Sequence, residues 1–172
     1  NKKITASAVY IKDENVIVGD KALDALAATP KNVVTETKRQ METDVVYSIE
    51  TGQWIEKSKG KDNDFSPAQI SSFILGKLKT YIPDIKKAVI TVPALFAEKA
   101  RVATLDAAKM AGIEVIELIN EPTAAACYYA SLPSVEKVTG KVLVFDLGGG
   151  TFDVTLCEVN GPKVDVITSR GD

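Results

Sequence analysis

The chain has 172 residues, with 21 lysines and arginines against 23 aspartates and glutamates, and a formal net charge of −2 at neutral pH. This near balance gives no reason to expect nucleic acid or an anionic membrane as a partner, and no apolar run approaches the ~20 residues of a membrane span. The sequence contains no histidine, which excludes Ser-His-Asp and Cys-His catalysis and histidine-ligated zinc. We therefore expect a soluble globular segment of an enzyme with one core, with or without an appended subdomain.

The first 64 residues carry short, mixed signals. Brief apolar runs rich in β-branched side chains predict short strands, and a proline directly after a helical pattern predicts the end of a helix. Residues 57–64 contain charges and a glycine but no apolar residue, so we expect a linker there. The other predicted elements are strands at 8–11 and 16–18, a helix near 21–28, and a hairpin of 45–49 with 53–55.

The signals become stronger from Phe65 onward. Ser66 and Pro67 are of the types that cap and begin a helix, and one apolar face of that helix would comprise Ile70, Phe73, Ile74, Leu78 and Tyr81. Alternation of helices and strands, followed by a meander, predicts a mixed α/β layer architecture. The elements predicted after this helix are a buried strand at 88–92, a helix at 98–111 ended by Gly112, a strand at 113–119, a helix at 120–130, a hairpin around 146–153 and a strand at 164–168.

Residues 146–153, Asp-Leu-Gly-Gly-Gly-Thr-Phe-Asp, are the most informative segment of the chain and lie between two strand candidates. Three consecutive glycines bring bare backbone N–H groups close to a ligand, which suits a phosphate. Asp146 and Asp153 cannot attract phosphate themselves, but they could hold Mg²⁺, which prefers a few carboxylates plus water. The alternative is an ordinary glycine-containing hairpin whose aspartates face solvent.

Three further positions each have an ordinary structural explanation beside a functional one. Glu121 lies at a strand-to-helix junction, where α/β folds place ligands, but an acid in the first turn also offsets the helix dipole. Local pattern explains Pro93 as a strand terminator and the Lys38-Arg39 pair as solvated charge.

Two other features have ordinary structural interpretations. Cys127 and Cys157 are far apart in sequence and form no C-x-x-C motif, so buried free thiols in a reducing compartment are favoured over a disulfide. This predicts a cytoplasmic protein. Arg170-Gly171-Asp172 spells an adhesion tripeptide, which we interpret as a charged turn at the end of the segment.

Three segments together resemble the ATPase domain of the seventy-kilodalton heat-shock chaperones. They are Ala-Val-Ile-Thr-Val-Pro-Ala at 88–94, Ile-Asn-Glu-Pro-Thr-Ala-Ala-Ala at 119–126, and Asp-Leu-Gly-Gly-Gly-Thr-Phe-Asp-Val at 146–154. Their order and spacing are comparable to the family's, and the resemblance covers almost the whole chain. It implies an actin-like, ribonuclease-H-like fold, in which ATP hydrolysis drives cycles of binding and release of unfolded polypeptides.

The resemblance also implies catalytic roles. Lys38 would position the attacking water or steady the γ-phosphate. Glu121, Asp146 and Asp153 would hold the water shell of Mg²⁺, and Thr151 would offer its hydroxyl and amide to the γ-phosphate. Phosphoryl transfer needs positioning and charge neutralisation more than covalent chemistry, so these residue types suit it.

Binding and signalling roles follow from the same resemblance. Backbone amides of the glycine run would bind the phosphates of ATP or ADP, and Pro93 and Arg101 match positions that relay nucleotide state to a peptide-binding domain. The implied partners are unfolded polypeptides, a J-domain co-chaperone and a nucleotide-exchange factor, with no nucleic acid and no membrane. The glycines concerned are Gly148, Gly149 and Gly150.

By the same resemblance we expect the chain to be most of lobe I only. Residues 1–64 would form its smaller outer subdomain, with the start of the chain at the edge of the inner sheet, and 65–172 its inner ribonuclease-H-like subdomain. Such a fragment would hold an incomplete ATPase site. The alternatives are a divergent chaperone regulator or exchange factor that does not hydrolyse ATP, a bacterial actin-like filament protein, and an α/β interaction domain without nucleotide.

Overall fold

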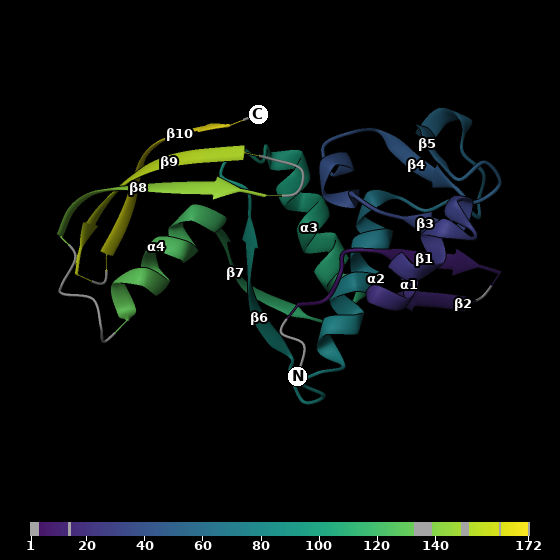
Figure 1. Ribbon diagram of the computed structural model, residues 1–172, viewed down its shortest axis with the longest axis horizontal. Helices are drawn as coiled ribbons and strands as arrows, with labels where there is room; N and C mark the ends of the chain where they lie inside the picture. The colour runs from purple at the N-terminus through teal and green to yellow at the C-terminus, as the bar shows by residue number, and fades with distance from the viewer. Residues whose placement is uncertain (1–3, 14, 133–138, 149–151, 162, 172) are drawn as a thin grey trace. The chain divides into compact units, whose positions relative to one another are not determined.

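The computed structural model describes residues 4–13, 15–132, 139–148, 152–161 and 163–171. Its secondary structure is mixed α/β, as predicted, with short sheets and flanking helices (Figure 1). Packing divides the chain into two compact units, one of Asn1–Ala88 with Glu98–Val115, and one of Val89–Ala97 with Ile116–Asp172. These units do not follow the subdomain division after residue 64, which stays a prediction.

The first unit begins with a three-stranded antiparallel sheet. Its central strand, β1 (Val9–Lys12), pairs with β2 (Asn15–Val18) and with β3 (Val33–Val34). A separate hairpin of β4 (Val45–Ser48) and β5 (Gln53–Glu56) confirms the predicted one. Short helices connect or follow these strands, namely α1 (Asp20–Asp24), η1 (Ala25–Ala27), η2 (Pro30–Asn32), η3 (Thr37–Gln40) and η4 (Lys57–Lys59).

Helix α2 (Pro67–Lys79) begins at the predicted residue, where Ser66 and Gln69 form a capping box. The Ser66 hydroxyl accepts a hydrogen bond from the Gln69 backbone N–H at 3.2 Å, and the Gln69 side chain accepts one from the Ser66 N–H at 2.8 Å. These bonds satisfy two of the donors that a helix start leaves unpaired. The helix packs against the sheets of the first unit, and the buried core there comprises Val9, Ile11, Val34, Tyr47 and Ile70.

The predicted apolar face of α2 is buried only in its first half. Ile70 is fully buried, and Phe73 and Ile74 pack against the core. Leu78 is 43% exposed and Tyr81, which lies beyond the end of the helix, is 57% exposed. The predicted face is therefore only partly covered at these two residues, although the Thr5 hydroxyl donates to the Tyr81 hydroxyl at 3.1 Å.

Helix α3 (Glu98–Met110) packs against α2, and its buried side chains are all small. Gly112 follows it with φ of 67°, the conformation that ends helices, as predicted. The Lys79 ammonium at the end of α2 donates to the Gly112 carbonyl at 2.8 Å, which joins the two helix ends. The buried residues of α3 are Ala100, Ala107 and Ala108.

Strands β6 (Lys87–Val92) and β7 (Glu114–Asn120) form a two-stranded sheet at the predicted positions. The prediction that the first of them is a buried strand was wrong. Val92 is 1% exposed, but Val89 is 49% exposed and Ile116 on β7 is 64% exposed. Apolar composition alone did not distinguish a strand covered on both faces from one that the described elements leave open.

The second unit consists mainly of α4 (Glu121–Ser131) packed on a three-stranded antiparallel sheet. The sheet has β9 (Phe152–Asn160) at its centre, between β8 (Thr139–Leu147) and β10 (Lys163–Gly171) (Figure 1). Alternate residues of β9 are buried, which identifies the covered face of the sheet. These residues are Asp153, Thr155, Cys157 and Val159.

Two predictions about this unit were wrong. Cys157 is a buried free thiol, as expected, but Cys127 on α4 is exposed. Arg170 and Gly171 lie in β10, paired with β9, so the tripeptide that begins at Arg170 does not begin with a turn. Across the described residues, no helix is long and apolar enough to span a membrane.

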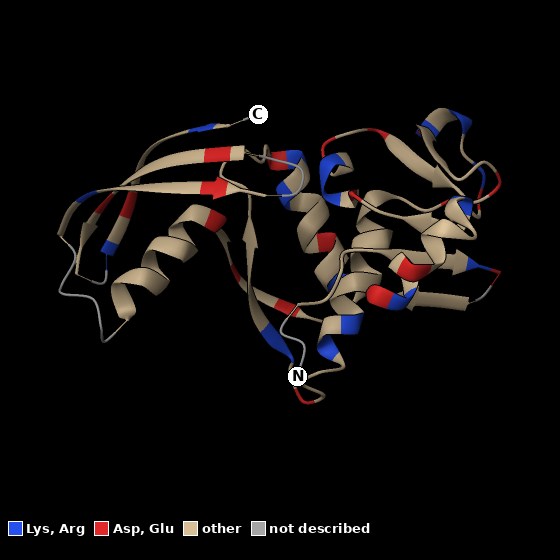
Figure 2. Ribbon diagram, viewed as in Figure 1, with Lys and Arg blue, Asp and Glu red and all other residues tan. Residues whose placement is uncertain are grey.

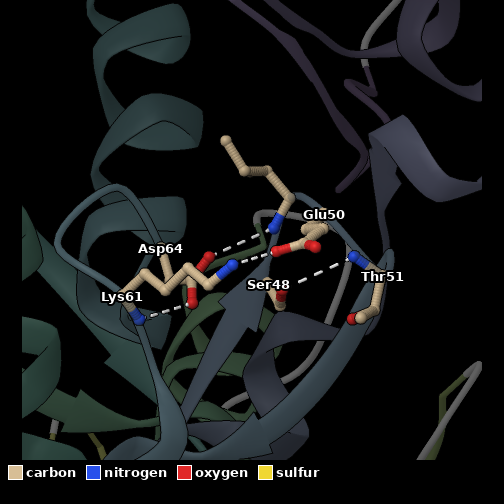
Figure 3. Close-up of polar contacts among 6 residues, drawn as sticks. Ser48, Glu50, Thr51, Lys61 and Asp64 are labelled. Carbon is tan, nitrogen blue, oxygen red and sulfur yellow. Dashed lines mark hydrogen bonds and ion pairs between the residues drawn. The ribbon is translucent and has the colours of Figure 1, made fainter.

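The segment at 57–64, predicted to be a linker, is anchored by a buried carboxylate instead. Asp64 is 8% exposed and accepts hydrogen bonds from the Lys61 N–H at 2.9 Å and the Ile49 N–H at 3.3 Å (Figure 3). The Lys61 ammonium also pairs with the Glu50 carboxylate across the same loop. A carboxylate can hold two loops together by accepting hydrogen bonds from the backbone N–H groups of both. The residue composition of the segment did not predict this role.

We predict that Asp64→Ala lowers the free energy of unfolding by about 1–3 kcal/mol, because two backbone donors lose their acceptor. Urea unfolding measures this change. Asp62→Ala, which removes an exposed acid of the same loop, is the matched control. Equal stability of the two variants would contradict the anchoring role of Asp64.

Candidate functional site

Asp146 and Asp153 lie directly opposite each other on neighbouring strands, just before the end of the β8–β9 ladder. Directly paired residues in a sheet point to the same face, here the face that α4 covers. Asp153 is 6% exposed, and Asp146 is partly exposed. Figure 2 shows acidic positions in red side by side where β8 finishes and β9 begins.

Such a pair is unfavourable by itself, because like charges directly opposite in a sheet repel. A cation that both carboxylates attract removes that cost. Mg²⁺ commonly keeps several waters and uses only one or two carboxylates, so the donors present at this position fit it. No group of three or more acidic or cysteine side chains gathers at metal-binding distance among the residues that the structure describes.

Side-chain contacts join β9 to each of its neighbouring strands near the aspartates, to β8 on one face of the sheet and to β10 on the other. On the face opposite the aspartates, the rings of Phe145 and Phe152 meet edge to face with centroids 4.8 Å apart. On the aspartate face, the hydroxyls of Thr155 and Ser169 share a hydrogen bond of 2.7 Å. Burial, with a smaller effect of Cys127, raises the pKa of the neighbouring Cys157 thiol, as expected for a dry interior.

The predicted phosphate-binding loop falls mostly outside the described residues. Gly148 follows β8 and is exposed. Gly149, Gly150 and Thr151 lie outside the described part of the chain, so their roles stay predictions. The described strands on either side fix where the loop leaves β8 and where it enters β9.

Glu121 begins α4 and is partly buried in its first turn. Asn120 ends β7 and provides the N-cap, while Pro122 at the next helical position is buried. Glu121 therefore belongs to the same unit as the aspartate pair, on a helix that packs against their sheet. Both explanations of Glu121, a ligand of the metal's water shell and an acid that offsets the helix dipole, are compatible with this position.

Lys38 lies in the first unit, on the short helix η3, and its side chain is exposed. The residues at either end of this turn face inward, since Thr37 is 4% exposed and Met41 is 5% exposed. The Ser71 hydroxyl of α2 contacts the Met41 sulfur at 3.5 Å. We did not predict that Thr37 and Met41 are buried. The sequence signal that could have indicated it is their spacing of four residues, one on each side of the basic pair.

The two predicted signalling residues occupy different units. Pro93 is buried directly after β6, and its carbonyl accepts a hydrogen bond from the Phe96 N–H at 3.2 Å, which closes a turn. Arg101 is partly buried on α3 in the first unit. The predicted role of both residues, to relay nucleotide state to a peptide-binding domain, stays a prediction.

Comparison with known proteins identifies the family. The family model described as Hsp70 protein matches residues 1–172, the entire chain. The chain belongs to the Hsp70 family. This membership and the observed architecture confirm the predicted α/β, actin-like ATPase fold class.

Curated relatives carry the name Chaperone protein DnaK. Those of Mycoplasmopsis agalactiae and Thermotoga neapolitana are each 41% identical to the chain, and that of Nitrosopumilus maritimus is 37% identical. The alignments cover 99% of this chain but only 26% or 27% of the relatives. The chain thus spans about a quarter of the length of these proteins.

We predict that Asp146→Asn raises the Mg²⁺ concentration required for half-maximal ATP turnover by roughly tenfold in the full-length protein. The amide keeps the shape of the side chain but loses the negative charge that attracts the cation. A magnesium titration of turnover measures the effect. Asp165→Asn, at the far end of the same sheet, is the control, and an unchanged requirement in Asp146→Asn would exclude a metal role for Asp146.

Proposed function

We propose that the full-length protein is a molecular chaperone that hydrolyses ATP and uses the energy to bind and release unfolded polypeptides. The observation that carries this proposal is the directly paired Asp146 and Asp153 at the end of a glycine-rich hairpin, in a chain of the Hsp70 family. Two carboxylates beside a run of backbone amides supply what Mg²⁺ and phosphates require. ATP and ADP are the proposed ligands, with Mg²⁺ as cofactor.

The proposed chemistry depends on charge and positioning. Mg²⁺, when bound, would neutralise phosphate charge as the phosphoryl group leaves. Asp146 and Asp153 hold and orient its water shell, with Glu121 as a further acceptor. Lys38 supplies a positive charge toward the γ-phosphate, and no residue needs to form a covalent bond.

The phosphate contacts in this proposal come from the hairpin loop. The backbone amides of Gly148, Gly149 and Gly150 and the hydroxyl of Thr151 donate to phosphate oxygens. Amides without side chains allow close approach, which makes this loop suitable for a polyanion.

The partners in this proposal are unfolded polypeptides, a J-domain co-chaperone and a nucleotide-exchange factor. Pro93 and Arg101 relay the nucleotide state toward the peptide-binding part of the protein. Free thiols at Cys127 and Cys157 support a reducing compartment, the cytoplasm.

The other candidate functions have less support. The family match over the whole chain favours a chaperone over an actin-like filament protein and over an α/β interaction domain without nucleotide. The presence of Lys38, Glu121, Asp146 and Asp153 favours hydrolysis over a regulator that only binds nucleotide.

We predict that Lys38→Ala lowers the kcat of ATP hydrolysis by roughly 100-fold or more while ADP affinity stays within a few-fold of wild type. The charge acts mainly as the phosphoryl group transfers, so its loss affects the transition state more than binding. Single-turnover hydrolysis and ADP titration separate the two effects. Lys31→Ala, which removes an exposed lysine of η2, should retain wild-type turnover. Wild-type turnover in Lys38→Ala would rule out its catalytic role.

A further inference from the structure

Gly171 lies on β10 directly opposite Asp153, whose other cross-strand partner is Asp146 on β8. The three residues therefore form one row across the sheet, with Asp153 on the central strand β9. The adhesion-like tripeptide includes this glycine, and pairing with β9 already assigns Arg170 and Gly171 to the sheet.

The Asp153 carboxylate fills the space that a side chain at position 171 would need. A Cβ atom built on Gly171 would overlap Oδ1 of Asp153, and would lie 3.1 Å from its Cγ and 2.7 Å from the Phe152 carbonyl oxygen. Gly171 does not have the left-handed backbone conformation of Gly140 or Gly161. Position 171 thus requires glycine because there is no space for a side chain, and not because of its backbone angles.

The missing side chain at Gly171 leaves the space that this carboxylate occupies. Because β10 and β8 flank β9 on opposite sides, a carboxylate that extends over Gly171 points away from Asp146. The two like charges are thereby kept apart while their Cβ atoms stay on the same face of the sheet. A hydrated cation needs such a separation, since its waters occupy the space between the carboxylates.

We propose that Gly171 is a positioning residue, because its lack of a side chain leaves the space in which the Asp153 carboxylate takes the orientation required for the magnesium-dependent step. The proposal rests on the proposed ATPase function. Any side chain at position 171 would push this carboxylate toward Asp146 or toward solvent. Gly171 would act only through Asp153 and would touch neither phosphate nor metal.

The first test compares Gly171→Ala with wild type in the full-length protein. The kcat of ATP hydrolysis should fall roughly 10- to 100-fold, the effect expected for an ångström-scale displacement. The added thermal stabilisation that Mg²⁺ gives to the ADP complex should also shrink. Gly76→Ala is the matched control, because a Cβ at that helical glycine meets nothing within 4 Å, and its turnover should be unchanged.

A second test uses the stability of the protein and remains valid if Gly171→Ala folds poorly. Removing the carboxylate relieves the overlap of the new methyl group with Oδ1 and leaves only its close approach to the Phe152 carbonyl, so Gly171→Ala should lower the melting temperature less in an Asp153→Ala background than in wild type. Equal losses in both backgrounds, or wild-type turnover and magnesium response in Gly171→Ala, would overturn the role of Gly171. Absence of magnesium-dependent ADP binding and hydrolysis in wild type would instead refute the proposed function, and the role of Gly171 with it.

Discussion

The pairing register of β8 and β9 is the constraint on which the candidate site depends. Because side chains alternate between the faces of a sheet, a slip of one residue would carry an aspartate to the opposite face. The observed register keeps Asp146 opposite Asp153 and leaves Phe145 and Phe152 on the other face. Packing of α4 on the aspartate face and the ring contact between Phe145 and Phe152, which spans the two strands, favour this register over its neighbours.

Two of the proposed functional groups, Lys38 and Glu121, are polar side chains that have buried neighbours along the chain. Lys38 is exposed while Thr37 and Met41 on the same turn are buried. Glu121 follows the same arrangement beside the buried Pro122. This arrangement lets packing, which is strong and non-directional, fix the backbone that carries these two side chains.

Sequence patterns predicted the features that depend on neighbours along the chain. The capped start of α2 at Ser66 and the end of α3 at Gly112 are local, and both were confirmed. The bond of Asp64 to the Ile49 N–H and the requirement for glycine at position 171 depend on residues distant in sequence, so no local pattern could reveal them. Exposure of Cys127 was missed for the same reason, since apolar character does not show which side of a helix is covered.

The central claim is that the hairpin carboxylates make nucleotide binding depend on Mg²⁺. Calorimetric titration of ADP into the full-length wild-type protein, with Mg²⁺ and then with a chelator, tests it most directly. We expect equimolar binding that weakens by at least roughly tenfold when the metal is removed. Equal affinity with and without Mg²⁺ would contradict the claim, because the paired carboxylates would then have no part in binding.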